Sequence, residues 1–336
     1  MTAQYQSDTT PWQIGAEGFP THGKPAEKLK FLLNYAILAP SSHNTQPWMF
    51  SVAEDTLKIF VDRSRWLKVA DPDQRELHIS LGCALENLLV AAEFYGYGHA
   101  VEYYPDPSDP DLAVKIELRP GGNVSEFRPI ALFEAIPERH TNHRVFEARD
   151  LPKSVRQNLK ECCVEKGISL HMTSDVDIKR KVEALIERGD ALQFADPAWR
   201  EELGYWIGQG VFGSSWLLSK IGRLAVTYLN MSKGTAKKDS DLLLSAPVLA
   251  IISSKEDDRR SQILAGQVYE RVNLMATVLG VQVHPMSQIV EIPELKAEVA
   301  DLLPQEDAIP QHPFRLGYAK KEKNHTPRRP LNEVMR

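Results

Sequence analysis

The pattern of apolar and polar positions predicts a chain built from alternating helices and strands. Apolar residues recur at helical spacing over residues 75–95 and again over 260–279, which predicts the two longest helices. Further helices are predicted over 29–38, 153–166, 177–194, 199–206 and 214–228. Runs rich in β-branched and aromatic residues predict strands after residue 48 and over 57–61, 100–104, 113–118, 247–252 and 314–318. After the turn at 120–123 the series begins again.

The two long helices share a pattern that favours an internal duplication. Apolar positions coincide when one helix is laid over the other at an offset of 184 residues. Four identities fall at that same offset, because Gly82, Glu86, Ala92 and Gly96 lie over Gly266, Glu270, Ala276 and Gly280. The alternative is two unrelated core helices, since an amphipathic helix that ends in glycine is common.

The composition is that of an ordinary globular protein and excludes several classes of function. The 336 residues are 43% hydrophobic and 25% charged, and the net charge of −5 argues against a nucleic-acid or anionic-membrane partner. We find no apolar run of about 18 residues and no signal-peptide pattern. The three cysteines, Cys83, Cys162 and Cys163, have neither zinc nor disulfide-framework spacing. We therefore expect a reducing, cytoplasmic location and no metal site.

The segment 39–48 carries the most informative motif of the chain. Proline ends the preceding helix, because its ring clashes with the carbonyl one turn back and it has no N–H to donate. The turn that follows offers short, rigidly placed hydroxyl and amide groups, which suit a planar ligand that forms hydrogen bonds. A helix stop rich in turn residues is the alternative. The candidate ligand-binding residues of this segment are Pro40, Ser41, Ser42, Asn44 and Gln46.

A basic cluster at residues 139–144 is the second candidate. Its members are Arg139, His140, Thr141, His143 and Arg144. Arginine suits a phosphate because its planar fork makes two parallel charge-assisted hydrogen bonds. A solvated basic turn is the alternative, and a zinc site lacks the further ligands that it would need.

Two later segments supply the remaining candidates. A second basic pair, near the end of the chain, follows the strand 314–318 and could also bind phosphate or stand as a solvated tail. The segment 280–288 follows the second long helix and ends in polar residues. The candidate residues are Arg328 and Arg329 in the first, Pro285, Met286, Ser287 and Gln288 in the second, and Lys238 before the strand 247–252.

Taken together, these motifs resemble the FMN-dependent nitroreductase family. The run Pro-Ser-Ser-x-Asn-x-Gln-Pro-Trp at 40–48 resembles the loop that lies against the flavin ring in that family. The cluster at 139–144 resembles its Arg-x-Ser-x-Arg motif, which binds the FMN phosphate, and residues 327–331 resemble its C-terminal Pro-Arg-Arg-Pro-Leu pattern. One departure leaves a choice open, because His143 stands at the second basic position and Arg144 is displaced by one.

The distribution of the motifs resembles the Acg-like branch, in which two nitroreductase-like halves are fused in one chain. The flavin-ring loop occurs only in the front half and the arginine motifs only in the back half. The resemblance implies an α+β fold that forms an intrachain pseudo-dimer, with mixed sheets flanked by long helices. We predict halves at 1–125 and 126–336, with a candidate lid at about 199–230.

The resemblance also implies a function. We expect one FMN, reduced by NAD(P)H and reoxidised by a nitroaromatic or quinone-like acceptor in a ping-pong cycle, in a monomeric pseudo-dimer or weak homodimer. The flavin N5 would carry the chemistry, so no catalytic side chain is predicted. The rival interpretation is a protein that sequesters FMN beneath a closed lid without turnover. A third is an interaction protein that binds no flavin.

Overall fold

A computed structural model describes residues 10–213, 216–228 and 240–336. The strands are β1 (Trp48–Ala53), β2 (Thr56–Val61), β3 (Tyr97–Tyr103), β4 (Leu112–Pro120), β5 (Ile168–Thr173), β6 (Val248–Ser254), β7 (Gln282–Pro285) and β8 (Ile309–Gly317). The helices are α1 (Pro25–Ala36), α2 (Arg75–Phe94), α3 (Ile130–Ala135), α4 (Lys153–Glu161), α5 (Val176–Ala195), α6 (Pro197–Gly208), α7 (Trp216–Tyr228), α9 (Arg259–Val278) and α10 (Pro293–Ala300). The predicted α+β class is confirmed.

The same β-β-α-β-β arrangement occurs twice. The first sheet has the strand order β1-β2-β4-β3 and the second has β5-β6-β8-β7, with α2 and α9 at the same point of each series. Within both sheets the strand pairs are antiparallel. Parallel pairing, which makes the sheets mixed, comes from the isolated bridges Phe50–Met335 and Thr141–Val283. The shared topology supports the predicted duplication.

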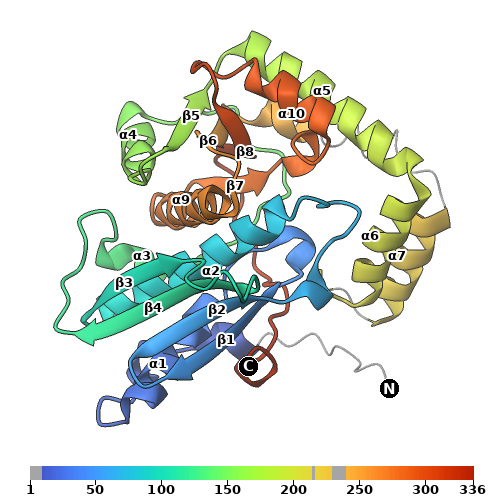
Figure 1. Ribbon diagram of the computed structural model, residues 1–336. Coiled ribbons are helices and arrows are strands. Elements are labelled where there is room, and N and C mark those ends of the chain that lie inside the picture. The colour runs from blue at the N-terminus through green and yellow to red at the C-terminus, as the bar shows by residue number, and fades with distance from the viewer. Residues whose placement is uncertain (1–9, 214–215, 229–239) are drawn as a thin grey trace.

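The helices α2 and α9 lie between the two sheets and pack against each other (Figure 1). Their closest approach is at Gly82 and Gly266. A Cβ on Gly82 would lie 2.0 Å from the carbonyl oxygen of Ile263, and a Cβ on Gly266 would lie 2.1 Å from that of Ile79. These two contacts are equivalent at the offset of 184 residues, so a pseudo-twofold axis passes between the glycines.

Helix α2 is the one helix among the described residues that has the length and apolar composition needed to cross a membrane. Of its most apolar stretch, 94% is buried inside the protein. The helix packs on α9, α1 and α3. Its apolar composition is accounted for by this central place in the core.

The C-terminal segment returns from the second sheet to the first. The N–H of Phe50 donates to Val334 and the N–H of Arg336 donates to Phe50, so the segment runs beside β1. Arg329 donates to the backbone oxygen of Gln46 at 3.0 Å and pairs with Asp62 at 3.0 Å. The end of the chain therefore ties the two sheets together beside the loop at 40–47.

The pattern missed four short elements and otherwise found the framework. It did not predict α3, α10, the edge strand β5 or the four-residue strand β7. Helices of 6 and 8 residues are too short to establish a helical period. Strand β5 is only partly buried, so its sequence lacks a strong apolar signal. The predicted helix at 214–228 begins at residue 216 in the described part of the chain.

Candidate functional site

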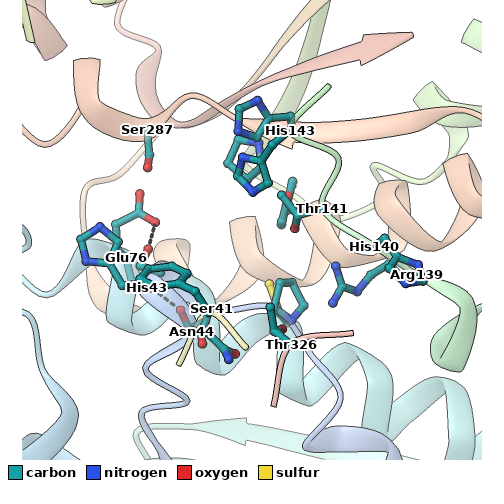
Figure 2. A pocket seen from close by; sticks show the side chains of 18 of the residues that line it. Ser41, His43, Asn44, Glu76, Arg139, His140, Thr141, His143, Ser287 and Thr326 are labelled. Atoms are coloured by element: carbon teal, nitrogen blue, oxygen red, sulfur yellow. Dashed lines mark hydrogen bonds between the residues drawn. The ribbon is translucent and has the colours of Figure 1, made fainter. Parts of the chain in front are cut away.

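A cavity of about 410 Å³ lies where the two halves meet. It is lined by the loop after α1, by α2 and α9, and by residues from the back half and the C-terminal segment. Figure 2 shows Glu76 near one end and Arg139 and His140 near the other, with Ser41 and Asn44 between them. Its volume lies within the range typical of sites for cofactors and drug-sized ligands.

The loop at 40–46 has an unusual backbone that the sequence dictates only in part. Helix α1 ends at Ala36, four residues before Pro40. His43, Asn44 and Gln46 have φ angles of 48°, 52° and 53°, a left-handed conformation that is uncommon for residues other than glycine. Ser41 Oγ accepts a hydrogen bond from the N–H of Gln46 at 2.9 Å. Such outliers are typical of ligand-binding loops, where surrounding contacts offset the strain.

Two members of this loop make tight contacts with other segments. Ser42 Oγ donates to Glu76 Oε2 on α2 at 2.6 Å. Asn44 Nδ2 donates to the carbonyl oxygens of Val211 and Pro327 at 2.6 and 3.0 Å, and Asn44 Oδ1 accepts from Arg328 at 2.9 Å. Asn44 therefore joins the loop, the α6–α7 connection and the C-terminal segment.

The cationic end of the cavity is built from Arg139, His140, His325 and Arg328. Both arginines donate to the carbonyl oxygen of Leu38, at 3.4 and 3.1 Å. The ring of His325 stacks at 4.0 Å on His140 and at 4.0 Å on another pocket residue, Trp12. Burial lowers the pKa of His325 to about 4, and burial beside Arg139 lowers the pKa of Arg328 well below its ordinary value. Two crowded, buried cations favour an anion between them.

The geometry bears on the open choice between His143 and Arg144. His143 lines the cavity, with its ring 4.3 Å from that of His284. Arg144 lies outside the lining, is half exposed and pairs with Glu322 at 2.6 Å. The proximity favours His143 as the ligand contact.

The opposite end of the cavity is acidic. Glu76 pairs with Arg75 at 2.7 Å, and neighbouring cations and hydrogen bonds keep the pKa of its carboxyl well below the usual range. Glu291 interacts with Ser287 Oγ at 3.1 Å and accepts from Gln193 at 2.6 Å. Burial and the nearby Glu76 raise the pKa of Glu291 to about 7. One carboxylate is thus held charged beside one that titrates near neutrality.

The structure brings most of the predicted site residues together. Those around the cavity are Pro40, Ser41, Ser42, Asn44, Arg139, His140, Thr141, His143, Pro285, Ser287 and Arg328. Outside its lining are Gln46, Arg144, Met286, Gln288 and Arg329. Lys238 lies outside the described residues. The bond between Gln46 Oε1 and the N–H of Arg329, at 2.7 Å, shows that these two motif residues also bind each other.

Sequence reasoning missed several residues of the lining. The main ones are Trp12, Glu76, Tyr269 and His312. Glu76 and Tyr269 lie on the long helices, and no motif distinguishes them from the other residues of those helices. His312 lies in β8. The one available signal was histidine use, since six of the ten histidines line this cavity.

Buried polar atoms that lack hydrogen-bond partners among the described residues gather around this cavity. They include Arg139 Nη1, Arg328 Nε, His140 Nε2, Tyr269 Oη and His312 Nε2. Buried polar atoms are nearly always paired in native proteins. Their concentration here indicates a polar ligand that supplies the missing partners.

Comparisons with known proteins agree with this picture. No protein-family model matches the chain. The chain is 29% identical over 331 residues to the Mycobacterium tuberculosis protein named "Putative NAD(P)H nitroreductase Rv3131", covering 96% of this chain and 94% of that protein. It is 27% identical over 316 residues to "Putative NAD(P)H nitroreductase acg" of the same organism, covering 91% and 94%. The chain resembles the Acg-like nitroreductases.

One solved structure illustrates the level of structural likeness. The FMN-dependent nitroreductase NfnB of Mycobacterium smegmatis, solved in complex with NADPH, gives a TM-score of 0.45 at 15% identity. The match covers 61% of this chain and 97% of that one. The relatives above cover nearly the whole of this chain, and they carry the Acg-like resemblance.

The positions that the offset of 184 residues relates to Cys83 and Glu270 are Gln267 and Glu86, and both belong to a network of the chain's own side chains. Glu86 binds Arg128 and Arg271 at 2.8 and 2.7 Å, and Arg271 also binds Glu165 at 2.7 Å. Gln267, which occupies the position of Cys83 in the repeat, accepts from Tyr103 at 2.7 Å. The counterpart of one cavity residue, Cys83, is therefore part of a paired polar network.

Proposed function

We propose that the chain binds one FMN in the cavity between its halves and uses NAD(P)H to reduce small nitroaromatic- or quinone-like acceptors. The observation that carries this proposal is the group of buried polar atoms around one cavity that find no partner in the described part of the chain, with two arginines at one end. A phosphate monoester supplies the acceptors that such donors lack. The Acg-like resemblance over nearly the whole chain supports the same ligand.

The roles of the residues follow from their places. Arg139, Arg328 and His143 would hold the phosphate, and the loop at 40–44 with Ser287 would border the ring. FMN, when bound, supplies two-electron redox chemistry, and the protein binds and orients the cofactor. Glu291, which titrates near neutrality at the acidic end, could hold a proton needed by the acceptor. The three free cysteines agree with a reducing, cytoplasmic setting.

The second candidate function is FMN sequestration, which one observation favours. Phe212 lines the cavity from the connection between α6 and α7, and Asn44 binds the adjacent carbonyl of Val211 at 2.6 Å. We propose that the described part of the predicted lid, residues 199–213 and 216–228, covers the cavity; residues 214, 215, 229 and 230 of the predicted segment lie outside the described residues. A lid held closed by this bond would keep the nicotinamide away from the flavin.

Anaerobic mixing of the FMN-loaded protein with NADH or NADPH separates the two functions. The enzyme should lose its flavin absorbance within seconds, and a nitroaromatic or quinone should restore it, since lids that gate catalysis open in about microseconds to milliseconds. Reduction by dithionite but by neither nicotinamide would support sequestration. Failure to bind FMN at all would overturn both.

A further inference from the structure

Glu86 and Glu270 occupy the same position in the two halves, and both side chains are fully buried. They are separated by the offset of 184 residues that also relates Gly82 to Gly266. Each lies one helical turn beyond its glycine, on α2 or α9. The surroundings of the two carboxylates can therefore be compared within one molecule, because the pseudo-twofold axis relates their positions.

Glu86 is saturated by partners. Its two carboxylate oxygens accept from Arg128 at 2.8 and 3.0 Å and from Arg271 at 2.7 and 2.8 Å. Such bidentate pairs are among the strongest hydrogen bonds in proteins. These cations and hydrogen bonds hold the pKa of the Glu86 carboxyl well below its usual range.

Glu270 has no such partners. Neither carboxylate oxygen accepts a hydrogen bond of good geometry among the described residues. The side-chain amide of Asn87 interacts with the carboxylate and lowers its pKa, and the nearest cation is Arg139, whose Nε lies 3.4 Å away. The position of Arg271 in the first half is taken by Asn87, which carries no charge. Burial raises the pKa of Glu270 to about 8, although Arg139 and Arg328 act against it. An incompletely paired carboxylate is costly to keep charged in a buried place.

The protonation state of Glu270 sets the charge behind the cationic end of the cavity. With Glu270 ionised, Glu270, Arg139 and Arg328 sum to one positive charge. With Glu270 neutral they sum to two, which matches a phosphate monoester dianion. The incoming dianion also repels a charged Glu270, so it favours the neutral form.

We propose that Glu270 is a specificity-determining residue: in its protonated form it matches the site to a phosphate monoester dianion, and in its ionised form it weakens that preference. The inference rests on the proposed FMN site. The residue acts through Arg139 and Arg328, because it does not line the cavity. Glu86, with both arginines committed to it, has no such freedom.

Arg328 also faces Glu270, and burial beside Arg139 lowers its pKa well below the ordinary value. A pH dependence that persists in variants without the Glu270 carboxyl would therefore belong to Arg328. The other neighbours of Glu270 keep their charge between pH 7.5 and 9.5. On the same helix and on α2, burial raises the pKa values of Tyr269 and Cys83 well above their ordinary ranges. The carboxyls of Glu86 and Glu76 stay ionised. Imidazoles with ordinary pKa values are largely neutral above pH 7.5, and the phosphate is a dianion.

The test is the ratio of riboflavin to FMN dissociation constants between pH 7.5 and 9.5, measured by quenching of flavin fluorescence. Riboflavin shares the ring and lacks the phosphate, so the ratio removes effects on the ring. In the wild type the ratio should fall about tenfold between pH 7.5 and 9, as expected when binding requires one proton on a group with a pKa of about 8. In Glu270→Gln and in Glu270→Met it should stay constant.

Glu165→Gln is the matched control, since it removes a carboxylate from the paired network around Arg271 and Glu86. It should retain the wild-type fall. Calorimetry of FMN binding at pH 8.5, in buffers of different ionisation enthalpy, should show uptake of most of one proton by the wild type and none by Glu270→Gln. Equal pH profiles for wild type and both Glu270 variants would overturn the inference. Absence of FMN binding to the wild type at pH 7.5 would instead overturn the proposed function.

Discussion

The contact between Gly82 and Gly266 allows a sharp prediction about how the halves are joined. In Gly82→Ala the new Cβ would stand 2.0 Å from the Ile263 oxygen and 2.9 Å from the Gly266 Cα. Ordinary contacts begin near 3.4 Å, so α2 and α9 must separate by roughly 1.4 Å. The obstacle is backbone, which cannot turn away as a side chain would.

We expect this overpacking to cost about 3 kcal/mol, against a gain of roughly 0.5–1 kcal/mol from replacing a helical glycine by alanine. The net loss of about 2 kcal/mol should appear in urea unfolding followed by tryptophan fluorescence. Gly266→Ala should lose a similar amount, because its Cβ meets the Ile79 oxygen at 2.1 Å. The double variant should lose less than the sum, since one separation of the helices relieves both contacts.

Gly189→Ala in α5 is the control. Its Cβ would have its closest neighbours at 3.4 Å, so the change should be neutral or slightly stabilising. The Gly82 and Gly266 variants should also weaken FMN binding, because Cys83 on α2 and Tyr269 on α9 line the cavity. Stability within about 0.5 kcal/mol of wild type in both variants would refute the pseudo-twofold contact.

Three further predictions concern charged groups of the cavity. Arg139→Ala should weaken FMN binding about ten- to a hundredfold and leave riboflavin binding unchanged; equal losses for both ligands would remove Arg139 from the phosphate site. When the pH falls from 8 to 6, the FMN affinity of the wild type should rise more than that of His143→Arg, because the imidazole gains a proton and the arginine is already charged. The same change in affinity for both proteins would assign the contact to Arg144. Burial and Glu76 raise the pKa of Glu291 to about 7, so the folded protein loses stability as pH rises from about 4.5 to 7. Glu291→Gln should therefore raise the melting temperature at pH 8 and not at pH 4, and an equal effect at both would contradict that shift.

The order of the long helices and central strands could be predicted because apolar residues recur in them at regular spacing. Helices α2 and α9 have enough turns for their spacing to be unambiguous, and their shared residues Gly82 and Gly266 indicated the duplication. The structure places these glycines at the crossing of the helices. Local motifs likewise indicated the segments around the cavity.

The details of the site could not be predicted because they depend on the approach of distant segments. His312 is a strand residue and Trp12 comes from the start of the chain, and neither has a neighbour in sequence that marks it as a ligand contact. Conversely, the motif residues Gln46 and Arg329 lie outside the cavity lining and bind each other. A motif predicted the right region without separating residues that face a ligand from residues that support the loop.

Flavin stoichiometry tests the central claim, a single FMN site made by both halves, most directly. The purified chain would be saturated with FMN, freed of excess and denatured, and flavin and polypeptide would be quantified separately. One flavin per chain is predicted, because the flavin-ring loop occurs only in the front half and the arginine motifs only in the back half. Two flavins per chain would contradict the single site, and none would contradict the FMN assignment itself.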